Sequence, residues 1–265
     1  MPAFRVATWN LDCWKRSKVS REASWRWLRE TIRPDIALLQ ETIPPSGVGP
    51  VIWKEDGIDR KRPWSSAVAS FGLPIREVRK WKGNAHTKEK DLRRTFPGTV
   101  IAGLVEVPYD APIAVASLYG LIDQGYASTT VHRQLSDLNP LLDSPQGKRL
   151  IVGGDLNCST QLDPPYRNIH RNLFERFEVH GLVNLTHATR DRRPQLEGCP
   201  CEEIQGCGHV QTHRHSRSGK PWQDDYIFAS EELARRLNSC EVIDQGSPGP
   251  WEFSDHCPIV ATFDL

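Results

Sequence analysis

Ser254-Asp255-His256-Cys257-Pro258, close to the C-terminus, sets an acid beside a histidine immediately before an apolar, strand-like run. Three upstream motifs combine acids and amides, and each stands where a strand-like run ends: Trp9-Asn10-Leu11-Asp12, Leu39-Gln40-Glu41-Thr42 and Gly154-Asp155-Leu156-Asn157. Polar groups that repeatedly follow strands indicate a site built at one rim of a sheet. These four motifs therefore direct the interpretation of the whole chain.

Apolar periodicity predicts strands and helices that alternate along the chain. The expected strands are Phe4–Asn10, Ile36–Leu39, Ser66–Ser70, Thr99–Val107, Ile113–Tyr119, Leu150–Gly153, Asp225–Ala229 and Ile259–Phe263. The expected helices are Arg21–Ile32, Thr129–Leu142, Arg167–His180 and Glu231–Leu237. Without a linker or a repeat, this order favours a single layered α/β domain over residues 1–265. Arg76–Arg94 and Asp191–Pro221 interrupt the pattern and are expected to be long surface loops.

Composition narrows the cellular context and the partners. The 265 residues include 34 Lys and Arg against 33 Asp and Glu, so a polyanionic partner would have to meet local basic patches. No apolar stretch approaches the roughly 20 residues of a membrane span, and no leader or lipidation motif is recognisable. The seven cysteines are an odd number, mostly scattered. We expect a cytoplasmic monomer with reduced thiols and no membrane partner.

Three acids of these motifs are suited to a hard cation. Asp12, Glu41 and Asp255 offer carboxylate oxygens, which Mg²⁺ and Mn²⁺ prefer. A single Asn or Asp after a strand is most often part of a turn. Recurrence in four places argues against that explanation, because clustered carboxylates are costly without a cation.

The other polar residues of the motifs suit a phosphate. Asn10 and Asn157 are neutral amides that can hold a phosphate oxygen or a carboxylate. His256 can donate to an anionic oxygen if an acid holds its second nitrogen, and Asp225 is the candidate for that role. Asp155 has no obvious partner in the sequence.

Taken in order, Trp-Asn-x-Asp, Leu-Gln-Glu-Thr, Gly-Asp-Leu-Asn, Asp-Tyr and Ser-Asp-His-Cys-Pro resemble the endonuclease/exonuclease/phosphatase superfamily, over residues 9–258. The motifs are most similar to those of exonuclease III and the apurinic endonucleases. The resemblance implies a deoxyribonuclease I-like, four-layered α/β sandwich, in which two central mixed β-sheets are flanked by helices. It also implies hydrolysis of phosphate esters with Mg²⁺ or Mn²⁺.

The resemblance also implies roles for individual residues. The metal would be bound by Glu41 with Asp12 and Asp255. The implied catalytic residues are Asn10, Tyr119, Asp155, Asn157, Asp225 and His256. Among them, Asp155 would orient or deprotonate the attacking water. His256, paired with Asp225, would stabilise charge on the phosphate.

The substrate is less sharply indicated, and DNA is favoured over RNA. Basic residues flank Trp81 in the Arg76–Arg94 stretch, which would suit a nucleic acid, although a solvated loop explains them equally well. Trp222-Gln223-Asp224-Asp225-Tyr226 departs from the repair endonucleases, which have Arg and an apolar residue before Asp-Tyr. A small, lipid or tyrosyl-linked phosphate ester remains an alternative, as does a catalytically silent binding module.

The second expected loop is a Cys/His-rich insert at about 191–221. Its candidate ligands for a structural Zn²⁺ are Cys199, Cys201, Cys207 and His209. A disulfide or unliganded side chains are the alternatives, since Cys-x-Cys is a less typical zinc spacing than Cys-x-x-Cys. Thr212 and His213 could instead reach the phosphate.

Overall fold

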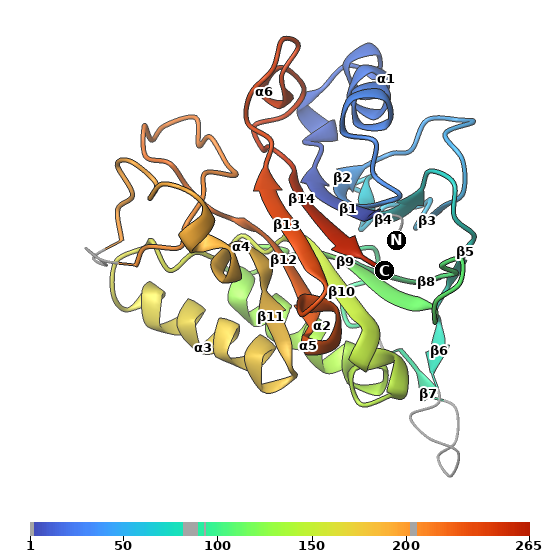
Figure 1. Cartoon of the computed structure of the whole chain (residues 1–265). Helices are drawn as coiled ribbons and strands as arrows, with labels where there is room; N and C mark the ends of the chain where they lie inside the picture. Colours follow the sequence, from blue (N-terminus) through green and yellow to red (C-terminus); the bar gives the residue numbers. More distant parts are fainter. Residues whose placement is uncertain (1–2, 82–89, 93, 202–205) are drawn as a thin grey trace.

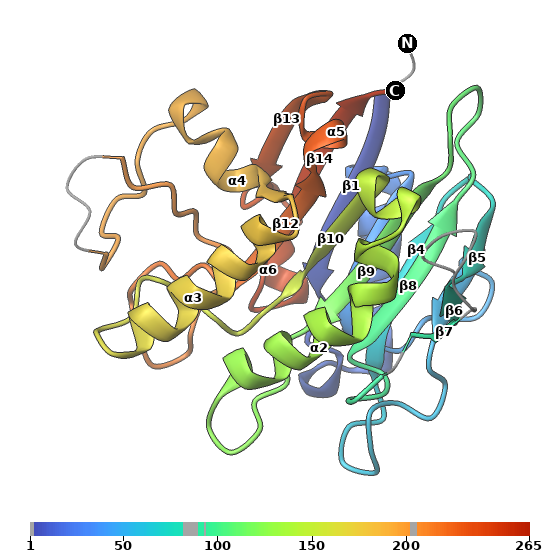
Figure 2. The same cartoon turned by 90° about the horizontal axis from the view of Figure 1, so that it is seen from below.

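The computed structural model describes residues 3–81, 90–92, 94–201 and 206–265. Two mixed six-stranded sheets pack face to face, and helices cover their outer faces (Figures 1 and 2). The predicted four-layered α/β sandwich is therefore confirmed. No helix in the described ranges is both long and apolar enough to cross a bilayer.

The first sheet has the order β13-β14-β1-β2-β4-β3. Its strands are, in that order, Leu237–Val242, Ile259–Asp264, Ala3–Asn10, Ile36–Thr42, Ser65–Ser70 and Val51–Trp53. β1 and β2 are parallel and in a register that sets Asn10 opposite Gln40. β14 is antiparallel to β1, so the residues just before β14 lie at the edge where β1 and β2 end.

The second sheet has the order β11-β12-β10-β9-β8-β5. Its strands are, in that order, Leu182–Asn184, Asp225–Ser230, Leu150–Asp155, Ile113–Tyr119, Val100–Val105 and Ile75–Glu77. β9 and β10 are parallel, with Tyr119 opposite Asp155. β12 is antiparallel to β10 and begins with Asp225 opposite that same Asp155. One row across this sheet therefore carries three polar site residues.

Apolar side chains fill the space between the sheets. Val6 and Leu38 of the first sheet belong to one buried cluster with Val115 and Ile151 of the second. Burial of each such side chain contributes roughly 1.5–3 kcal/mol. Gly153 permits the close approach, because a Cβ there would lie 3.1 Å from the Thr8 Cβ. The polar ends of the strands are thus brought together by an apolar core.

The longer helices cover the outer faces of the sheets. α1 (Lys18–Trp27), capped by Ser17 Oγ and continued by a π-helical turn over Leu28–Ile32, packs its tryptophans on the first sheet. α2 (Ala127–Leu142) and α3 (Tyr166–Val179) cover the second sheet (Figure 2). The shorter helices are α4 (Leu185–Ala188), α5 (Glu231–Ala234) and α6 (Pro250–Phe253).

The structure corrects three expectations. The Arg76–Arg94 stretch is not a plain loop, because β5 extends into it and β6 (Lys80–Trp81) pairs with β7 (Lys90–Asp91). Trp81 is buried in the core and offers no exposed ring for stacking. The Glu231–Leu237 helix ends at Ala234, and strand β13 begins at Leu237. Strands β3 and β11, of three residues each, were also missed because they are too short to show a period.

Candidate active site at the rim of the two sheets

Asn10 joins the two sheets at their common rim. Its Nδ2 donates to Asp155 Oδ2 of the second sheet at 2.8 Å and contacts Glu41 Oε1 of the first at 3.2 Å. Its Oδ1 accepts a bond from the Asp12 backbone N–H. Burial raises the pKa of Glu41, and it raises the pKa of Asp155 to well above its ordinary value. One neutral amide thus links two buried acids without adding charge.

His256 is held on three sides. Its Nδ1 lies 2.7 Å from Asp225 Oδ2, its backbone N–H donates to Ser254 Oγ, and its carbonyl accepts from Trp9 Nε1. Burial opposes a positive charge on the ring, but the carboxylates of Asp225 and Asp155 outweigh it and raise the pKa of His256 well above its ordinary value. The Nε2 atom lies 4.0 Å from Asp155 Oδ2 and is directed toward the rim. The ring is therefore oriented by Asp225, and the neighbouring carboxylates favour its protonated form.

Two cations lie against the acids at the end of β1. Lys15 Nζ is 2.7 Å from Asp255 Oδ2 and 3.4 Å from Asp12 Oδ1, and an Arg16 nitrogen is 3.0 Å from Asp12 Oδ2. Burial and the Asp255 charge nevertheless raise the pKa of Asp12. Glu41 Oε2 is buried without a hydrogen-bond partner of good geometry among the described residues. This end of the rim thus holds an excess of buried carboxylate oxygens.

Three site residues have left-handed backbone conformations. The φ angles of Asp12, Glu41 and Asn157 are 46°, 44° and 48°. Such conformations cost free energy in residues other than glycine and tend to accumulate at functional sites. Asp12 and Asn157 lie two residues beyond the ends of β1 and β10, and Glu41 is the next-to-last residue of β2.

Asn157 and Tyr119 complete the cluster on the second sheet. The Asn157 backbone N–H donates to Asp155 Oδ1 at 2.9 Å, and its amide donates to the Gly120 carbonyl. The Tyr119 ring packs edge-on against Trp64. Burial and the nearby Glu41 carboxylate raise the pKa of Tyr119, so its hydroxyl remains protonated.

A second imidazole lies directly over the first. The rings of His213 and His256 stack with centroids 4.4 Å apart and planes inclined by 9°. His213 Nδ1 lies 2.7 Å from Asp224 Oδ2, just as His256 faces Asp225. Two signals for this pair are present in the sequence, namely the extra acid before Asp225 and a histidine in the insert. Their pairing was not predicted, because the contact depends on how the insert folds back.

The rim cluster brings together all nine residues predicted for catalysis or Mg²⁺ binding: Asn10, Asp12, Glu41, Tyr119, Asp155, Asn157, Asp225, Asp255 and His256. Lys15 contacts two of these acids, Asp12 and Asp255, which was not predicted from the sequence. Nor was the role of Ser254 Oγ, which ties His256 to the carbonyl of Asn10. A serine before Asp-His has no distinctive signal in the sequence.

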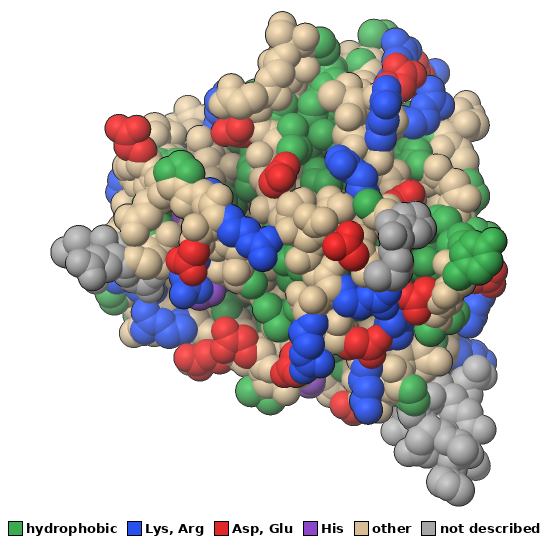
Figure 3. All heavy atoms as spheres, in the orientation of Figure 1, with side chains coloured by type: hydrophobic (Ala, Val, Ile, Leu, Met, Phe, Trp, Pro, Cys, Tyr) green, Lys and Arg blue, Asp and Glu red, His purple; other side chains and the backbone are tan. Residues whose placement is uncertain are grey.

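The predicted basic surface is only partly realised. Arg79 and Arg94 are paired with Glu77, at 2.7 and 2.9 Å. Lys82, Lys88 and Arg93 of the predicted patch lie outside the described residues. Basic and acidic side chains are interspersed over the face in Figure 3. At the rim itself, Trp14 is 60% exposed, and its ring lies 4.7 Å from Lys15 Nζ.

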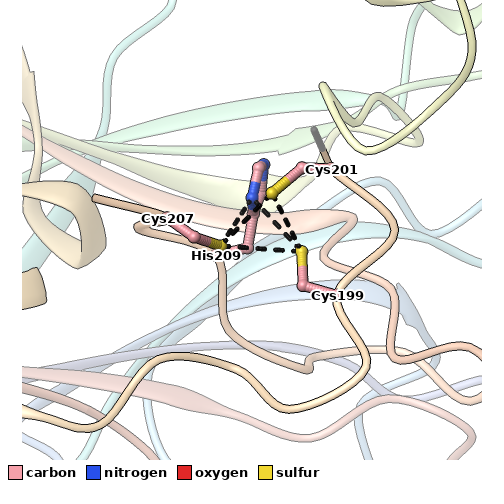
Figure 4. Close-up of side chains that lie close together, drawn as sticks. All are labelled: Cys199, Cys201, Cys207 and His209. Carbon is pink, nitrogen blue, oxygen red and sulfur yellow. Dashed lines mark hydrogen bonds between the residues drawn. The ribbon is translucent and has the colours of Figure 1, made fainter. Parts of the chain in front are cut away.

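The candidate zinc ligands of the insert also come together, away from the rim cluster. Three sulfurs and one ring nitrogen converge in Figure 4, from Cys199, Cys201, Cys207 and His209. The sulfur–sulfur distances are 3.3–3.6 Å, so no pair is joined by a disulfide bond. Cavities of about 550 and 450 Å³ border the insert, and the rim residues line neither of them.

Several solved structures share the fold of this chain over nearly its whole length. The endonuclease domain of TRAS1, a telomere-specific non-LTR retrotransposon, is 20% identical with a TM-score of 0.65, covering 99% of both chains. An AP endonuclease from Archaeoglobus fulgidus is 18% identical (TM-score 0.61, covering 99% of this chain and 100% of its own). TDP2 of D. rerio, complexed with a single-strand DNA product, is 15% identical (TM-score 0.56, covering 100% of both).

The TM-scores of these structures establish a shared, deoxyribonuclease I-like fold. No curated protein matches the chain significantly. The sequence pattern described as the Endonuclease/Exonuclease/phosphatase family matches residues 7–256, which include the whole rim cluster. The chain therefore belongs to the endonuclease/exonuclease/phosphatase family.

Proposed function

We propose that this protein is a Mg²⁺- or Mn²⁺-dependent phosphodiesterase that cleaves DNA. The observation that carries the proposal is the pairing of two units at one rim. Asn10 holds the buried Asp155 at 2.8 Å, and Asp225 holds His256 at 2.7 Å. A base and a charge-stabilising donor, here with Asp155 Oδ2 and His256 Nε2 4.0 Å apart, are what hydrolysis of a phosphodiester requires.

The acid-rich end of the rim fits a divalent cation. Glu41, with Asp12 and Asp255, would hold it, since hard oxygen donors are the ligands these metals prefer. Glu41 Oε2 is buried and has no hydrogen-bond partner of good geometry among the described residues, which supports this assignment. When bound, such a cation offsets the negative charge of the phosphate. Lys15, which lies between Asp12 and Asp255, stands close enough to compete for the same oxygens.

His256 is assigned to the phosphate. Because Asp225 occupies its Nδ1, the proton on Nε2 is free to be donated to a non-bridging phosphate oxygen as charge develops there. The neighbouring carboxylates raise the pKa of His256, which favours the protonated ring. Tyr119, whose pKa is also raised, would be a second donor on the opposite side of Glu41.

Asp155 is assigned to the attacking water. Its Oδ2 is held by Asn10 and its Oδ1 by the Asn157 backbone, so the carboxylate cannot rotate. Burial raises its pKa well above the ordinary value, which makes the deprotonated form a stronger base. The Asn157 amide, 3.3 Å from Asp155 Oδ2, is placed to orient the water or a phosphate oxygen.

His213 is proposed as a further donor. It carries its own acid, Asp224, and it stacks on His256, so both imidazoles face the same space. This arrangement favours the expectation that the insert reaches the phosphate. Two aligned imidazoles would share the stabilisation of negative charge.

DNA is the proposed substrate for two reasons. The TDP2 structure, with the same fold, contains a single-strand DNA product. The rim also carries the exposed Trp14 beside Lys15, a ring and a cation suited to a base and its phosphate. The nearly neutral net charge of +1 and the paired arginines of the Arg76–Arg94 stretch keep a small phosphate ester as the second candidate.

A substrate panel tests the proposal. The purified protein, with Mg²⁺, Mn²⁺ or a chelator, is incubated with abasic duplex, single-stranded DNA, RNA, a 5′-tyrosyl DNA end and inositol phosphates. We expect metal-dependent cleavage of at least one DNA substrate. Cleavage of RNA or inositol phosphates alone would replace DNA as the substrate. Failure to cleave any member with either metal would favour a silent binding module.

A further inference from the structure

The insert contains a second cluster of polar side chains, which the phosphodiesterase site does not use. It consists of three thiols and one imidazole: Cys199, Cys201, Cys207 and His209 (Figure 4). We propose that this Cys₃His cluster binds one Zn²⁺ ion, which fixes the insert so that His213 stays over His256. The zinc ion has a structural role and touches no substrate.

The dimensions of the cluster match tetrahedral zinc. Zn–S bonds of about 2.3 Å and Zn–N bonds of about 2.0 Å place sulfurs about 3.8 Å apart, and sulfur and nitrogen about 3.5 Å apart. The three sulfur pairs lie at 3.3, 3.4 and 3.6 Å. His209 Nδ1 lies 3.4 Å from Cys207 Sγ and 3.6 Å from Cys199 Sγ. These five edges come within about half an ångström of the ideal tetrahedron.

The surrounding groups orient these ligands. His209 Nε2 lies 2.8 Å from Thr160 Oγ1, a contact that fits a proton on Nε2; the Nδ1 lone pair would then face the sulfurs. Gln161 Nε2 contacts Cys199 Sγ at 3.2 Å, as an amide donor does toward a thiolate. Outer hydrogen bonds of this kind are typical of built zinc sites. Thiols without a metal would not require these outer contacts, so their presence favours a bound ion.

The charge and hardness of the ligands favour zinc over the ion of the rim cluster. Thiolates are soft ligands and select Zn²⁺ or iron in preference to Mg²⁺. Three thiolates and one neutral imidazole are a common structural zinc set with no open position. The two clusters should therefore bind different metals independently.

A short hydrogen-bonded path connects the cluster to the active site. The Val210 backbone N–H, next to His209, donates to Gln223 Oε1 at 3.0 Å. Gln161 Oε1 accepts from the Gln223 backbone N–H at 2.7 Å. Gln223 precedes Asp224, the partner of His213. The cluster thus anchors both segments that form the second imidazole pair.

The chain after His209 continues directly into the rim. Thr212 Oγ1 accepts from the Asp224 and Asp225 backbone N–H groups, both at 3.1 Å. The Thr212 carbonyl accepts from the Cys257 N–H at 2.9 Å. Loss of zinc would free the start of this segment, and we expect His213 to lose its stacked position while His256 keeps Asp225.

Metal analysis of the full-length protein tests the proposal. The protein is produced in zinc-containing medium, treated with a mild chelator that removes Mg²⁺, and analysed for metal and for free thiols. We expect about one zinc per chain, retained through the treatment. Cys207→Ser and His209→Ala should each lose most of it. His215→Ala, in the same insert, and Cys240→Ala, in the core, are matched controls that should keep it.

A second measurement covers variants that fail to fold. Wild-type protein produced with Co²⁺ should show the intense thiolate-to-metal absorption of a tetrahedral sulfur site. Wild-type protein that is folded but has no bound zinc, or that has a disulfide among these three cysteines, would overturn the proposal. The role of His213 at the phosphate rests on the proposed function, but the zinc content of the protein does not. A zinc-loaded protein without hydrolase activity would contradict the phosphodiesterase proposal alone.

Discussion

His213 lies in the insert, and its ring stacks on that of His256. If it donates to the phosphate beside His256, His213→Ala should lower kcat about tenfold to a hundredfold, in line with the loss of one stabilising donor. Asp224→Asn should have a smaller effect in the same direction, because the ring remains but loses its orientation. Steady-state kinetics on the best substrate measures both changes.

The control for His213 is its exposed neighbour His215, which lies in the same insert. His215→Ala should leave kcat unchanged. An unaltered kcat in His213→Ala would show that its stacking on His256 is only a packing contact.

The left-handed backbone of Asn157 predicts a separation of stability from activity. Asn157→Ala and Asn157→Gly both remove the amide and should lower activity alike. Only glycine relieves the positive φ of 48°, so the glycine variant should be more stable than the alanine variant by about 1 kcal/mol. Urea unfolding of both proteins measures the difference, and equal stabilities would contradict the strain.

Strand β10 depends on a glycine for its pairing with β9. A Cβ at Gly154 would lie 1.8 Å from the Leu118 carbonyl oxygen, closer than any backbone atom can tolerate. Gly154→Ala should therefore destabilise the protein by roughly 3 kcal/mol or more. Thermal unfolding measures this loss.

Gly219 of the insert provides the matched control for Gly154. It has no neighbour within 4 Å of an added Cβ, and Gly219→Ala should change stability by less than about 0.5 kcal/mol. Similar unfolding temperatures for the two alanine variants would show that β9 and β10 can separate without loss.

The elements were predictable where their apolar periodicity was long. α2 and β9 appear close to their expected ranges, since both carry an apolar pattern over a full face. The hairpin β6–β7 and strand β13 were not predicted. Their charged residues carry no period, and Trp81 is buried by tertiary packing that no local pattern reports.

The site residues were likewise predictable where a local motif marks them, and not where a contact depends on tertiary packing. Asp155 and His256 were identified from motifs at strand ends, because sheet topology forces strand ends to meet. The stacking of His213 on His256, and the Lys15 contact with Asp255, required the insert and the turn after β1 to fold back. Such contacts between distant segments leave no local trace in the sequence.

At the opposite end of the molecule, ion pairs tie the two sheets together. Asp110 Oδ2, before β9, lies 2.8 Å from Arg236 Nη1, before β13, and 3.0 Å from Arg149 Nη2. Burial opposes the charge on Asp110, but the Ala111 N–H and the two arginines lower its pKa below the ordinary value. At this end the carboxylate is paired with two arginines, whereas the rim holds buried carboxylate oxygens without such partners among the described residues.

The lowered pKa of Asp110 predicts a pH dependence of stability. A lowered folded-state pKa stabilises the fold above the unfolded pKa, about 3.9, and that stabilisation is lost as pH falls through the folded pKa. Asp110→Asn should therefore cost up to about 1 kcal/mol near neutral pH, and the difference from wild type should shrink in acid. A difference that grew as the pH fell would contradict the ion pairs.

The two sheets share one pattern of neighbours. In each, a parallel pair is flanked by antiparallel strands, β14 and β4 around β1–β2, and β12 and β8 around β10–β9. Both parallel pairs end at the same rim, which is why Asn10 and Asp155 meet there. The whole molecule is thus arranged to bring two sets of strand ends together at one rim.

The decisive experiment is hydrolysis of the fastest substrate of the panel as Mn²⁺ is raised from zero, with wild type, Asp155→Asn and the exposed control Asp163→Asn. We expect wild type and Asp163→Asn to follow the same metal dependence. Asp155→Asn should lose at least about a hundredfold in rate, with an unchanged unfolding temperature. Full activity of Asp155→Asn, or metal-independent cleavage by wild type, would contradict a metal-dependent phosphodiesterase site at this rim.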